Sequence, residues 1–504
     1  MLASIPSASV IGSRGRPVTV EVHVSQGLPG LTMVGLPDEA CREARDRVRA
    51  AVTSSRLSWP TLRITINLAP TTERKGGSGL DLAIAIGVLV ATGQVPAQAV
   101  RDLGFVGELG LDGSVRAVTG AAPMVYALGT RVAVVASANA REARVAATGE
   151  VRVAHHLAEL VRCLRDGEPW PDVRDDGTDD VDEATLDLAD VRGQAVARLA
   201  LEVAAAGGHH LLFAGSPGSG KTMLASRLPG LLPPLEGPAS IEATMIRSAA
   251  GMGLPPGGMV RSAPFRAPHH SSSLVALVGG GTQQLRPGEV SLAHGGVLFL
   301  DELGEFSPSV LDALRQPLEE GVVRVARARA SATLEARFLL VAATNPCPCG
   351  GGPPGSCLCD EASRVRYLRR LSGPLLDRMD LRVLVERPDV DDLVAHGGAE
   401  PTAVVAGRVA AARLRALERA GVINARLPGD RLDEVAPLTA AAAARLRSEL
   451  ERQRLTGRGY HRVRRVALTL ADLRGESPPL IDDRVVEALA LRVRLGALSG
   501  SVAA

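Results

Sequence analysis

A glycine-rich segment with a lysine and a threonine is the part of the chain whose spacing most directly indicates chemistry. Residues 215–222 fit the pattern G-x-x-x-x-G-K-[ST] at every constrained position. The glycines let backbone N–H groups close around phosphate oxygens, the lysine reaches the β- and γ-phosphates, and the threonine hydroxyl binds Mg²⁺. The segment therefore predicts a nucleoside triphosphate site, with ATP and Mg²⁺ as cofactors. Its residues are Gly215, Ser216, Pro217, Gly218, Ser219, Gly220, Lys221 and Thr222.

Two apolar runs end in polar residues that suit the same chemistry. Residues 296–300 lead into Asp301 and Glu302, and residues 338–343 lead into Thr344 and Asn345. We expect Asp301 to hold the Mg²⁺ shell and Glu302 to polarise the water that attacks the γ-phosphate. Asn345 would position that water from a neighbouring strand.

An arginine at a helix end is a further candidate. Arg378 follows a short helical run at 375–376, where a neighbouring subunit could receive it. The elements expected around the glycine-rich segment are a buried strand at 211–214 and a helix that opens within 223–228. This order of strand, phosphate loop and helix makes the nucleotide interpretation stronger than that of a flexible Gly/Ser turn.

Composition limits the remaining classes of function. The 504 residues are enough for roughly three or four domains, and a net charge of +2 does not by itself indicate a nucleic-acid ligand. Aromatic residues make up only 2%, so a DNA contact would be arginine to phosphate rather than base stacking. The longest apolar run, 82–91, is far shorter than the roughly 20 residues that span a bilayer. We expect a cytoplasmic protein without a membrane partner.

The chain divides by composition into four parts and predicts an α/β protein. Residues 1–165 alternate strands and helices, including strands at 18–24 and 62–68 and an amphipathic helix at 37–54. The four expected parts are an N-terminal domain at 1–165, a solvated acidic linker at 166–187, an ATPase core at 188–387 and a helical C-terminal domain at 388–504.

Four cysteines lie within thirteen residues. Cys347 and Cys349 form one C-x-C pair, and Cys357 and Cys359 form another after seven residues. Four thiolates suit a tetrahedral Zn²⁺, although the usual spacing within a pair is two to four residues. The alternative is a reduced loop without metal, so the sequence leaves the zinc question open.

The order of these motifs resembles that of an AAA+ ATPase. The segment 264–271, followed by 287–302, resembles the magnesium-chelatase clade, and residues 20–492 resemble the YifB/ComM family of magnesium-chelatase-like ATPases. The resemblance implies a P-loop α/β core with a C-terminal helical lid and an ATP-dependent homohexamer. It assigns Walker A to 215–222, Walker B to Asp301 and Glu302, and sensor 1 to Asn345.

The same resemblance implies further roles. Arg378 would be the arginine finger acting in trans, and the sensor 2 arginine would be Arg458, with Arg465 as the alternative. The histidines at 269 and 270 would lie in the helix-2 insertion, in the central region of the hexamer. Relatives promote DNA branch migration, which makes a DNA-acting motor the leading interpretation. A magnesium chelatase motor subunit and a protein-remodelling ATPase are the alternatives.

A β-hairpin rich in arginine precedes the sensor 1 strand. Arg324, Arg327 and Arg329 lie in it, and the equivalent hairpin of related helicases reaches into the pore. A ring would repeat these arginines around a channel able to follow a phosphate backbone. We expect Arg327 and Arg329 to contact DNA, and an ordinary solvated hairpin is the alternative.

The N-terminal domain resembles Lon-type proteases and the ribosomal S5 domain 2-like fold. Residues 75–85 are similar to the segment around the Lon nucleophile, with Ser78 at that position. A Ser–Lys dyad needs an amine within reach of the hydroxyl, and residues 118–122 have alanine where Lon has its lysine. The only other lysine outside the phosphate loop is Lys75. We therefore expect a Lon-like scaffold without a protease dyad.

Overall fold

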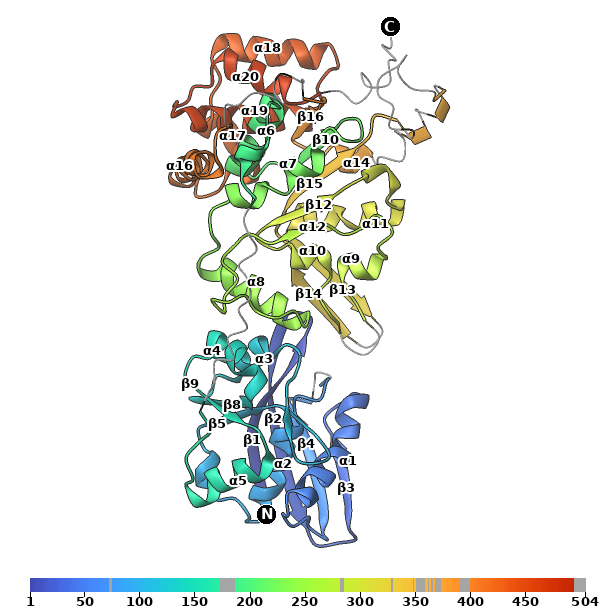
Figure 1. Ribbon diagram of the computed structural model, residues 1–504, viewed down its shortest axis with the longest axis vertical. Helices are drawn as coiled ribbons and strands as arrows, with labels where there is room; N and C mark the ends of the chain where they lie inside the picture. The colour runs from blue at the N-terminus through green and yellow to red at the C-terminus, as the bar shows by residue number, and fades with distance from the viewer. Residues whose placement is uncertain are drawn as a thin grey trace.

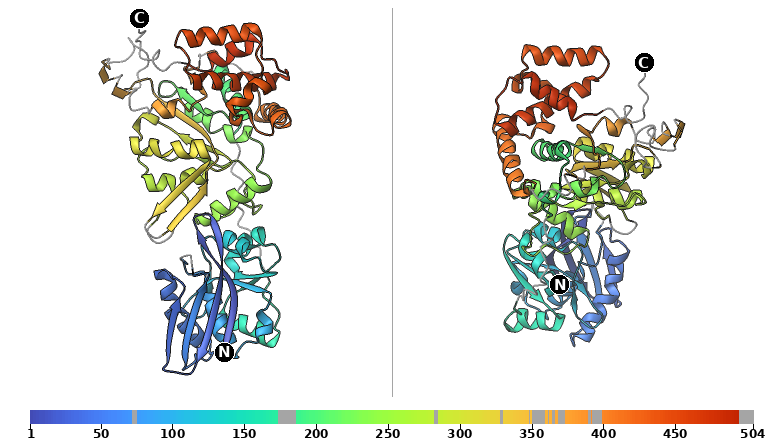
Figure 2. Two further views of the ribbon diagram at one scale, coloured as in Figure 1. Left: turned by 180° about the vertical axis from the view of Figure 1, so that it is seen from behind. Right: turned by 45° about the horizontal axis from the view of Figure 1, so that its top comes forward.

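The chain forms three units that follow one another along the long axis of the molecule (Figure 1). The view from behind shows the same order, with the N-terminal unit at one end and helices of the C-terminal part at the other (Figure 2). None of the helices in the described part of the chain is long and apolar enough to cross a membrane. The computed structural model describes residues 1–71, 75–172, 186–281, 285–327, 330–347, 349, 359–360, 362–363, 366–367, 373–388, 391 and 399–493.

The N-terminal unit begins with a four-stranded sheet in the order β1-β2-β4-β3. Along β2 the valines at 18, 20, 22 and 24 are buried between more exposed neighbours, as a half-buried strand requires. The predicted strands at 18–24 and 62–68 are confirmed within β2 and β4. The four strands are β1 (Leu2–Ile11), β2 (Arg14–Ser25), β3 (Gly30–Val34) and β4 (Arg63–Ala69).

Two helices pack on this sheet. Helix α1 (Glu39–Ser54) confirms the predicted amphipathic helix and begins after Asp38, whose carboxylate accepts a hydrogen bond from the Cys41 N–H at 2.8 Å. Helix α2 (Asp81–Ala91) contains the longest apolar run and is buried along almost its whole length. A helix that is apolar on every side belongs inside a core, and α2 joins the two halves of the unit there.

The second half of the unit has a parallel three-stranded sheet in the order β5-β8-β9. A two-stranded pair, β6 (Glu108–Leu109) and β7 (Val115–Arg116), lies next to it in sequence. The remaining elements are β5 (Leu103–Val106), α3 (Ala121–Leu128), β8 (Val132–Ala136), α4 (Ala140–Ala146), β9 (Glu150–Ala154) and α5 (Leu157–Asp166), with 3₁₀ turns at Ala97–Val100 and Ser137–Asn139.

The start of the expected linker packs against the hydrophobic core of the N-terminal unit. Trp170 packs on that core, and the guanidinium of Arg152 lies 4.8 Å from the centre of its ring. The prediction that a solvated linker begins at residue 166 is therefore wrong for its first residues, because an aromatic side chain can bury there. Residues 173–185 lie outside the described part.

The central unit is built on a parallel five-stranded sheet in the order β11-β12-β15-β10-β16. Three middle strands are completely buried, which explains their unbroken apolar sequences. The predicted strands at 211–214, 296–300 and 338–343 are confirmed. The five strands are β10 (Leu211–Ala214), β11 (Phe265–Arg266), β12 (Val297–Leu300), β15 (Leu339–Thr344) and β16 (Leu381–Leu384).

Helices and a hairpin surround this sheet. The antiparallel hairpin consists of β13 (Val322–Arg327) and β14 (Ala330–Glu335), and it confirms the predicted hairpin. The helices are α6 (Ala195–Gly207), α7 (Lys221–Ala225), α8 (Gly237–Ala249), α9 (Leu274–Val278), α10 (Glu289–Leu292), α11 (Pro308–Ala313), α12 (Arg315–Glu320) and α14 (Gly373–Leu376), with 3₁₀ turns at Leu188–Asp190, Leu228–Leu231 and Leu303–Glu305.

The C-terminal unit is helical in its described part. Helix α19 runs through its middle, and its buried residues share one core with α6 and the central sheet. The C-terminal unit and the central sheet therefore pack through a common hydrophobic core. Its helices are α16 (Thr402–Ala420), α17 (Leu432–Val435), α18 (Ala440–Glu451), α19 (Gly457–Arg474) and α20 (Asp482–Ala490), with 3₁₀ turns at Asn424–Arg426 and Gly429–Arg431.

The N-terminal unit docks on the central unit at α8 and at the hairpin. The Ser248 hydroxyl of α8 accepts from the Ala122 N–H at 3.2 Å and donates to the Glu142 carboxylate at 3.0 Å. On the other side, Arg14 forms an ion pair of 2.7 Å with Glu335 at the base of β14. These contacts join the first unit to two elements that flank the central sheet.

Candidate nucleotide site

The glycine-rich loop links the end of β10 to the start of α7. Gly218 and Gly220 have φ angles of +76° and +91°, which favour glycine because it has no Cβ. A Cβ built at either glycine would meet no other part of the protein within 4 Å, so the loop borders open space there. Helix α7 begins at Lys221 and not within 223–228 as predicted, because the left-handed Gly220 ends the loop two residues sooner.

Lys221 folds back over this loop. Its Nζ donates to the carbonyls of Gly215 and Ser216 at 2.7 and 2.9 Å, and to Oδ1 of Asn345 at 3.2 Å. The side chain is mostly buried, and burial lowers the pKa of Lys221, although Asp301 and Glu302 oppose that shift. The ammonium therefore lies between the loop and the sensor 1 position.

The acid pair lies at the end of β12. The Thr222 hydroxyl donates to Oδ2 of Asp301 at 2.7 Å, so two oxygen ligands from different segments meet at one place. Hydroxyl and carboxylate oxygens are the ligands that Mg²⁺ prefers. The two residues fit a magnesium ion held together with phosphate oxygens.

Glu302 has an unusual backbone and an unexpected neighbour. Its φ angle is +51°, which is uncommon for a residue with a Cβ, and its side chain is 52% exposed. Nδ1 of His270 lies 3.4 Å from Oε2 of Glu302. The family resemblance places His270 in an insertion in the central region of a ring and does not predict this contact. Strand β11 ends four residues before His270 and pairs in parallel with β12, which brings the two segments together. No local sequence pattern indicated this pairing.

Three strand ends explain why these groups meet. Strands β12, β15 and β10 are neighbours with parallel pairing, so their carboxyl ends lie on one edge of the sheet. Asn345 follows β15, the acid pair follows β12 and the glycine-rich loop follows β10. The structure thus brings together Lys221, Thr222, Asp301, Glu302 and Asn345.

Arg378 does not lie with this group. Its guanidinium pairs with the carboxylate of Glu319 on α12, and its side chain is largely buried. It follows α14, as the sequence predicted for a short helix before this arginine. Arg378 precedes β16, which runs parallel to β10, so it lies toward the amino ends of the strands, whereas the glycine-rich loop follows the carboxyl end of β10.

The two sensor 2 candidates lie on α19. Arg458 is exposed at the start of the helix, whereas Arg465 is half-buried, and burial lowers the pKa of Arg465. A cavity of about 470 Å³ at this helix start is also lined by Asp377 and Arg382. The first turn of α19 therefore borders the segment that carries Arg378.

Three of the four clustered cysteines are described. The Sγ atoms of Cys347, Cys349 and Cys359 all lie within 4.8 Å of one another. Cys347 is buried, and the pKa of Cys359 is raised to about 11, mainly by a hydrogen bond with Cys349. Cys357 lies outside the described residues. The cluster begins two residues after Asn345, directly beside the candidate nucleotide site.

The hairpin arginines are described only in part. Arg324 is exposed and pairs with Glu320 at 2.8 Å. Arg327 ends β13, where only its backbone is described, and Arg329 lies outside the described residues. At the base of the hairpin, Leu334 packs closely against Gly12. A Cβ built on Gly12 would lie 2.6 Å from Cδ2 of Leu334. The base is thus held against the N-terminal unit.

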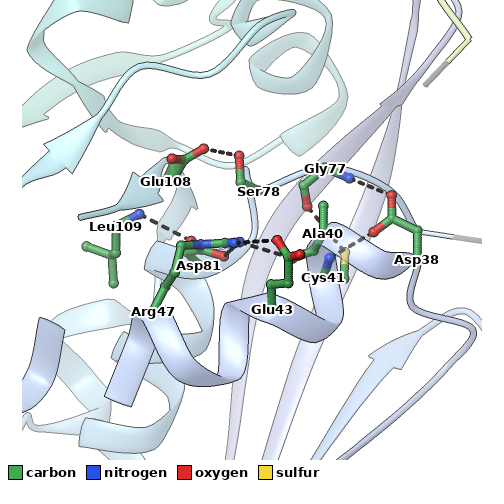
Figure 3. Close-up of polar contacts among 10 residues, drawn as sticks. All are labelled: Asp38, Ala40, Cys41, Glu43, Arg47, Gly77, Ser78, Asp81, Glu108 and Leu109. Carbon is green, nitrogen blue, oxygen red and sulfur yellow. Dashed lines mark hydrogen bonds and ion pairs between the residues drawn. The ribbon is translucent and has the colours of Figure 1, made fainter. Parts of the chain in front are cut away.

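The serine of the N-terminal unit lies in a polar cluster (Figure 3). The Ser78 hydroxyl donates to the carboxylate of Glu108. Below it, Asp81 is completely buried and accepts from Nε and Nη2 of Arg47 at 2.7 and 3.1 Å. Burial raises the pKa of Asp81 to about 6, although the Arg47 guanidinium opposes the shift.

Lys75 lies beside this cluster as part of the scaffold. Its side chain is buried, and its backbone bridges to 36–38 through a Lys75 N–H to Leu36 carbonyl bond of 3.2 Å and an Asp38 N–H to Lys75 carbonyl bond of 2.9 Å. Ala121 and Ala122, in the run aligned with the Lon lysine, are buried in a core between α3 and α4.

Three family models match the chain. "Magnesium chelatase, subunit ChlI" matches residues 187–393, which hold the whole candidate nucleotide site. "Subunit ChlI of Mg-chelatase" matches residues 20–139, and "Magnesium chelatase, subunit ChlI C-terminal" matches residues 399–492. The matches follow the three units of the structure.

Similar proteins extend over nearly the whole length. The chain is 43% identical to the competence protein ComM of Haemophilus influenzae over 97% of both chains. It is 43% identical to the uncharacterised protein YifB of Escherichia coli, over 94% of this chain and 93% of the other. An uncharacterised protein of Mycobacterium tuberculosis is 47% identical over 96% of this chain and 97% of its own.

The buried carboxylate of the N-terminal unit predicts a pH dependence of stability. The pKa of Asp81 is about 6 in the folded chain and about 4 when unfolded, so the folded state binds more protons between these values. Stability from this group is therefore present below about pH 4 and is lost, by up to about 3 kcal/mol, as the pH rises through about 6. Asp81→Asn removes this titration.

The measurement is the free energy of unfolding of both proteins between pH 4.5 and 7.5. Wild type should lose stability relative to Asp81→Asn as the pH rises. Glu43→Gln removes an exposed partner of Arg47 at 3.4 Å and is the matched control. Because it keeps Asp81, the difference in stability between it and wild type should not change with pH. A pH-independent difference between wild type and Asp81→Asn would contradict the prediction.

Proposed function

The chain belongs to the YifB/ComM family of magnesium-chelatase-like AAA+ ATPases, and we propose that it is a cytoplasmic, ATP-driven ring motor acting on DNA. The observation that carries the proposal is the convergence of Lys221, the Thr222–Asp301 pair, Glu302 and Asn345 on one edge of the sheet. This set contains a phosphate-binding cation, oxygen ligands for Mg²⁺, a general base and an amide that can orient water.

Each residue has a role in this proposal. Lys221 and the backbone of 215–222 bind the phosphates, and Thr222 and Asp301 hold Mg²⁺, which neutralises negative charge on the phosphate oxygens when it is bound. Glu302 accepts the proton of the attacking water, and Asn345 orients that water. The contact with His270 restrains the Glu302 carboxylate, because an imidazole 3.4 Å away can donate to it.

A second subunit completes the site in this proposal. Arg378 lies with Glu319, away from its own glycine-rich loop, and its place supports a role as an arginine finger for the neighbouring subunit of a homohexamer. Arg458, exposed in the first turn of α19, is our choice for sensor 2, with Arg465 as the alternative. The C-terminal helices would act as the lid.

The proposal that DNA is the substrate rests on sequence similarity to relatives and on composition. A relative of nearly the same length is a competence protein, and the family resemblance points to helicase or branch-migration activity. The arginine-rich hairpin supports binding through phosphates, since aromatic residues for base stacking are scarce. We propose that Arg327 and Arg329 make these contacts.

The N-terminal unit has no catalytic role in this proposal. We propose a Lon-like fold in which Ser78 is inactive, because its hydroxyl is bound to a carboxylate and the aligned lysine is replaced by alanine. Its docking on α8 and the hairpin supports a role in holding those elements.

A magnesium chelatase motor is the second candidate, because all three family models describe chelatase subunits. The two functions separate in one assay. ATP hydrolysis that rises with single-stranded or branched DNA supports the DNA motor, and hydrolysis that rises only with a porphyrin and its partner subunits supports the chelatase. Hydrolysis that responds to neither favours a protein-remodelling ATPase.

The cysteine cluster fits zinc in this proposal. Sulfurs around a tetrahedral zinc lie roughly 3.8 Å apart for Zn–S distances of about 2.3 Å, and the three described sulfurs lie within 4.8 Å of one another. Cys347, Cys349, Cys357 and Cys359 would hold the ion. Its position after Asn345 would brace the end of β15.

The first prediction of the proposed function concerns the general base. Glu302→Gln keeps the size of the side chain but removes its basicity, so ATP hydrolysis should fall below measurable levels while ATP binding stays within about threefold of wild type. Steady-state hydrolysis and binding of a fluorescent ATP analogue measure the two effects. Turnover within about tenfold of wild type would mean that Glu302 is not the base.

The second prediction concerns DNA. Replacing Arg327 and Arg329 together by alanine should weaken DNA binding and flatten its dependence on log salt by up to about 0.7–0.9 for each phosphate that the protein no longer neutralises. Fluorescence anisotropy over a salt series measures both quantities. Arg447→Ala, an exposed arginine on α18, is the control. An unchanged affinity and slope would move the DNA interface away from the hairpin.

The third prediction concerns zinc. Protein purified without chelators should contain about one zinc per chain, and Cys347→Ser or Cys359→Ser should lose it, as measured by elemental analysis. Cys163→Ser, a buried cysteine on α5 far along the chain from the cluster, is the control and should keep the metal. Wild-type protein free of zinc would establish the cluster as a set of reduced thiols.

A further inference from the structure

The backbone around Arg378 is held by an arginine of the C-terminal unit. Nη1 of Arg462, on α19, donates to the Arg378 carbonyl at 3.0 Å and also pairs with the Asp380 carboxylate. The charged donor thus bonds to the peptide unit of Arg378 itself. Charge-assisted bonds of this kind are stronger and more directional than bonds between neutral groups.

Two more arginines close around the same segment. Arg492 donates to the carbonyls of Met379 and Asp380 at 2.6 and 2.9 Å, and Arg382 donates to the Leu376 carbonyl at 2.6 Å. Together with Arg462, these side chains donate to the Leu376 carbonyl at the end of α14 and to the carbonyls of residues 378–380 that follow it. Arg462 and Arg492 belong to the C-terminal unit and Arg382 belongs to β16 of the central sheet, so both units hold this segment.

Asp380 connects this clamp to the central sheet. It is buried, and Nδ1 of His209 lies 3.4 Å from its Oδ2, while Nε2 of His209 lies 2.8 Å from the Thr469 hydroxyl of α19. Burial alone would raise the pKa of Asp380, but the hydrogen bond with His209 and the charge of Arg462 hold it well below its usual value. Asp380 is therefore ionised at neutral pH and keeps its ion pair with Arg462.

We infer that Arg462 is a positioning residue that sets the place of the Arg378 guanidinium for the neighbouring subunit. The inference rests on the proposed function, in which Arg378 acts in trans. Arg462 bonds to the backbone carbonyl of Arg378, whereas the Arg378 guanidinium pairs with Glu319. In the proposed function that pair opens when the guanidinium enters a neighbouring site. Because α19 carries Arg462, any shift of α19 relative to the sheet moves the finger that this subunit presents.

The first test separates rate from affinity. Arg462→Met keeps the aliphatic stem and removes the Nη1 donor that makes both bonds. A misplaced catalytic group costs up to about a hundredfold in rate. We expect kcat to fall by about tenfold to a hundredfold and the KM for ATP to stay within about twofold. Arg462→Lys, which keeps the charge and one donor, should recover part of the rate. Arg447→Met, an exposed position on α18, is the matched control.

The second test identifies the direction of action by mixing variants. Lys221→Ala lacks a working phosphate loop but has an intact finger, and Arg378→Ala is the reverse. Arg462→Met mixed with Lys221→Ala should regain activity, because its intact pocket receives an intact finger. Mixed with Arg378→Ala it should not, because no subunit presents a well-placed finger.

Other outcomes overturn the inference in distinguishable ways. Recovery with Arg378→Ala but not with Lys221→Ala would place Arg462 in its own nucleotide pocket. Failure of both mixtures, with mixed rings present and an unchanged melting temperature, would also reject a positioning role. If Lys221→Ala and Arg378→Ala do not complement each other although wild type hydrolyses ATP, the trans finger itself is wrong. A wild type without ATP hydrolysis would reject the proposed function.

Discussion

The parallel register of three buried strands is the constraint on which the rest of the structure depends. Strands β10, β12 and β15 lie side by side and run in the same direction, so each delivers its next residues to the same edge. The buried faces of the strands leave no room for polar residues before that edge. Polar groups therefore gather where the strands end, and the chemistry of the chain is concentrated there.

Lysine and arginine side chains have different roles in this chain, because the two cations differ in shape. A lysine ammonium is compact and can donate in three directions, as Lys221 does to two carbonyls and an amide oxygen. Arginine carries several donors on a planar guanidinium. Nη1 of Arg462 donates to the Arg378 carbonyl and the Asp380 carboxylate, and Nη1 of Arg492 donates to the carbonyls of Met379 and Asp380. These arginines thus hold the backbone around Arg378, whereas Lys221 lies where a point charge contacts several oxygens.

Local sequence was sufficient to predict the strands that end at the motif residues, but not the contacts between distant segments. The apolar runs at 211–214, 296–300 and 338–343 predicted three strands because complete burial removes polar residues from them. The contact of His270 with Glu302 was missed, since it depends on which strand pairs with β12. The Arg462–Asp380 pair joins residues 82 positions apart, and no local pattern marks it among so many arginines. The ordered Trp170 was missed because charge dominates its surroundings.

The hairpin lies between two groups that the proposed mechanism uses. Helix α12, which carries Glu319, leads directly into β13, and β14 leads into β15 and Asn345. A stretch from 319 to 345 therefore connects the partner of the finger, the hairpin and the residue at the sensor 1 position. The N-terminal unit contacts this stretch at the hairpin base, through Gly12 against Leu334 and Arg14 with Glu335. Through these contacts the N-terminal unit can restrain the base of the hairpin, which in the proposed mechanism lies between the partner of the finger and the sensor 1 position.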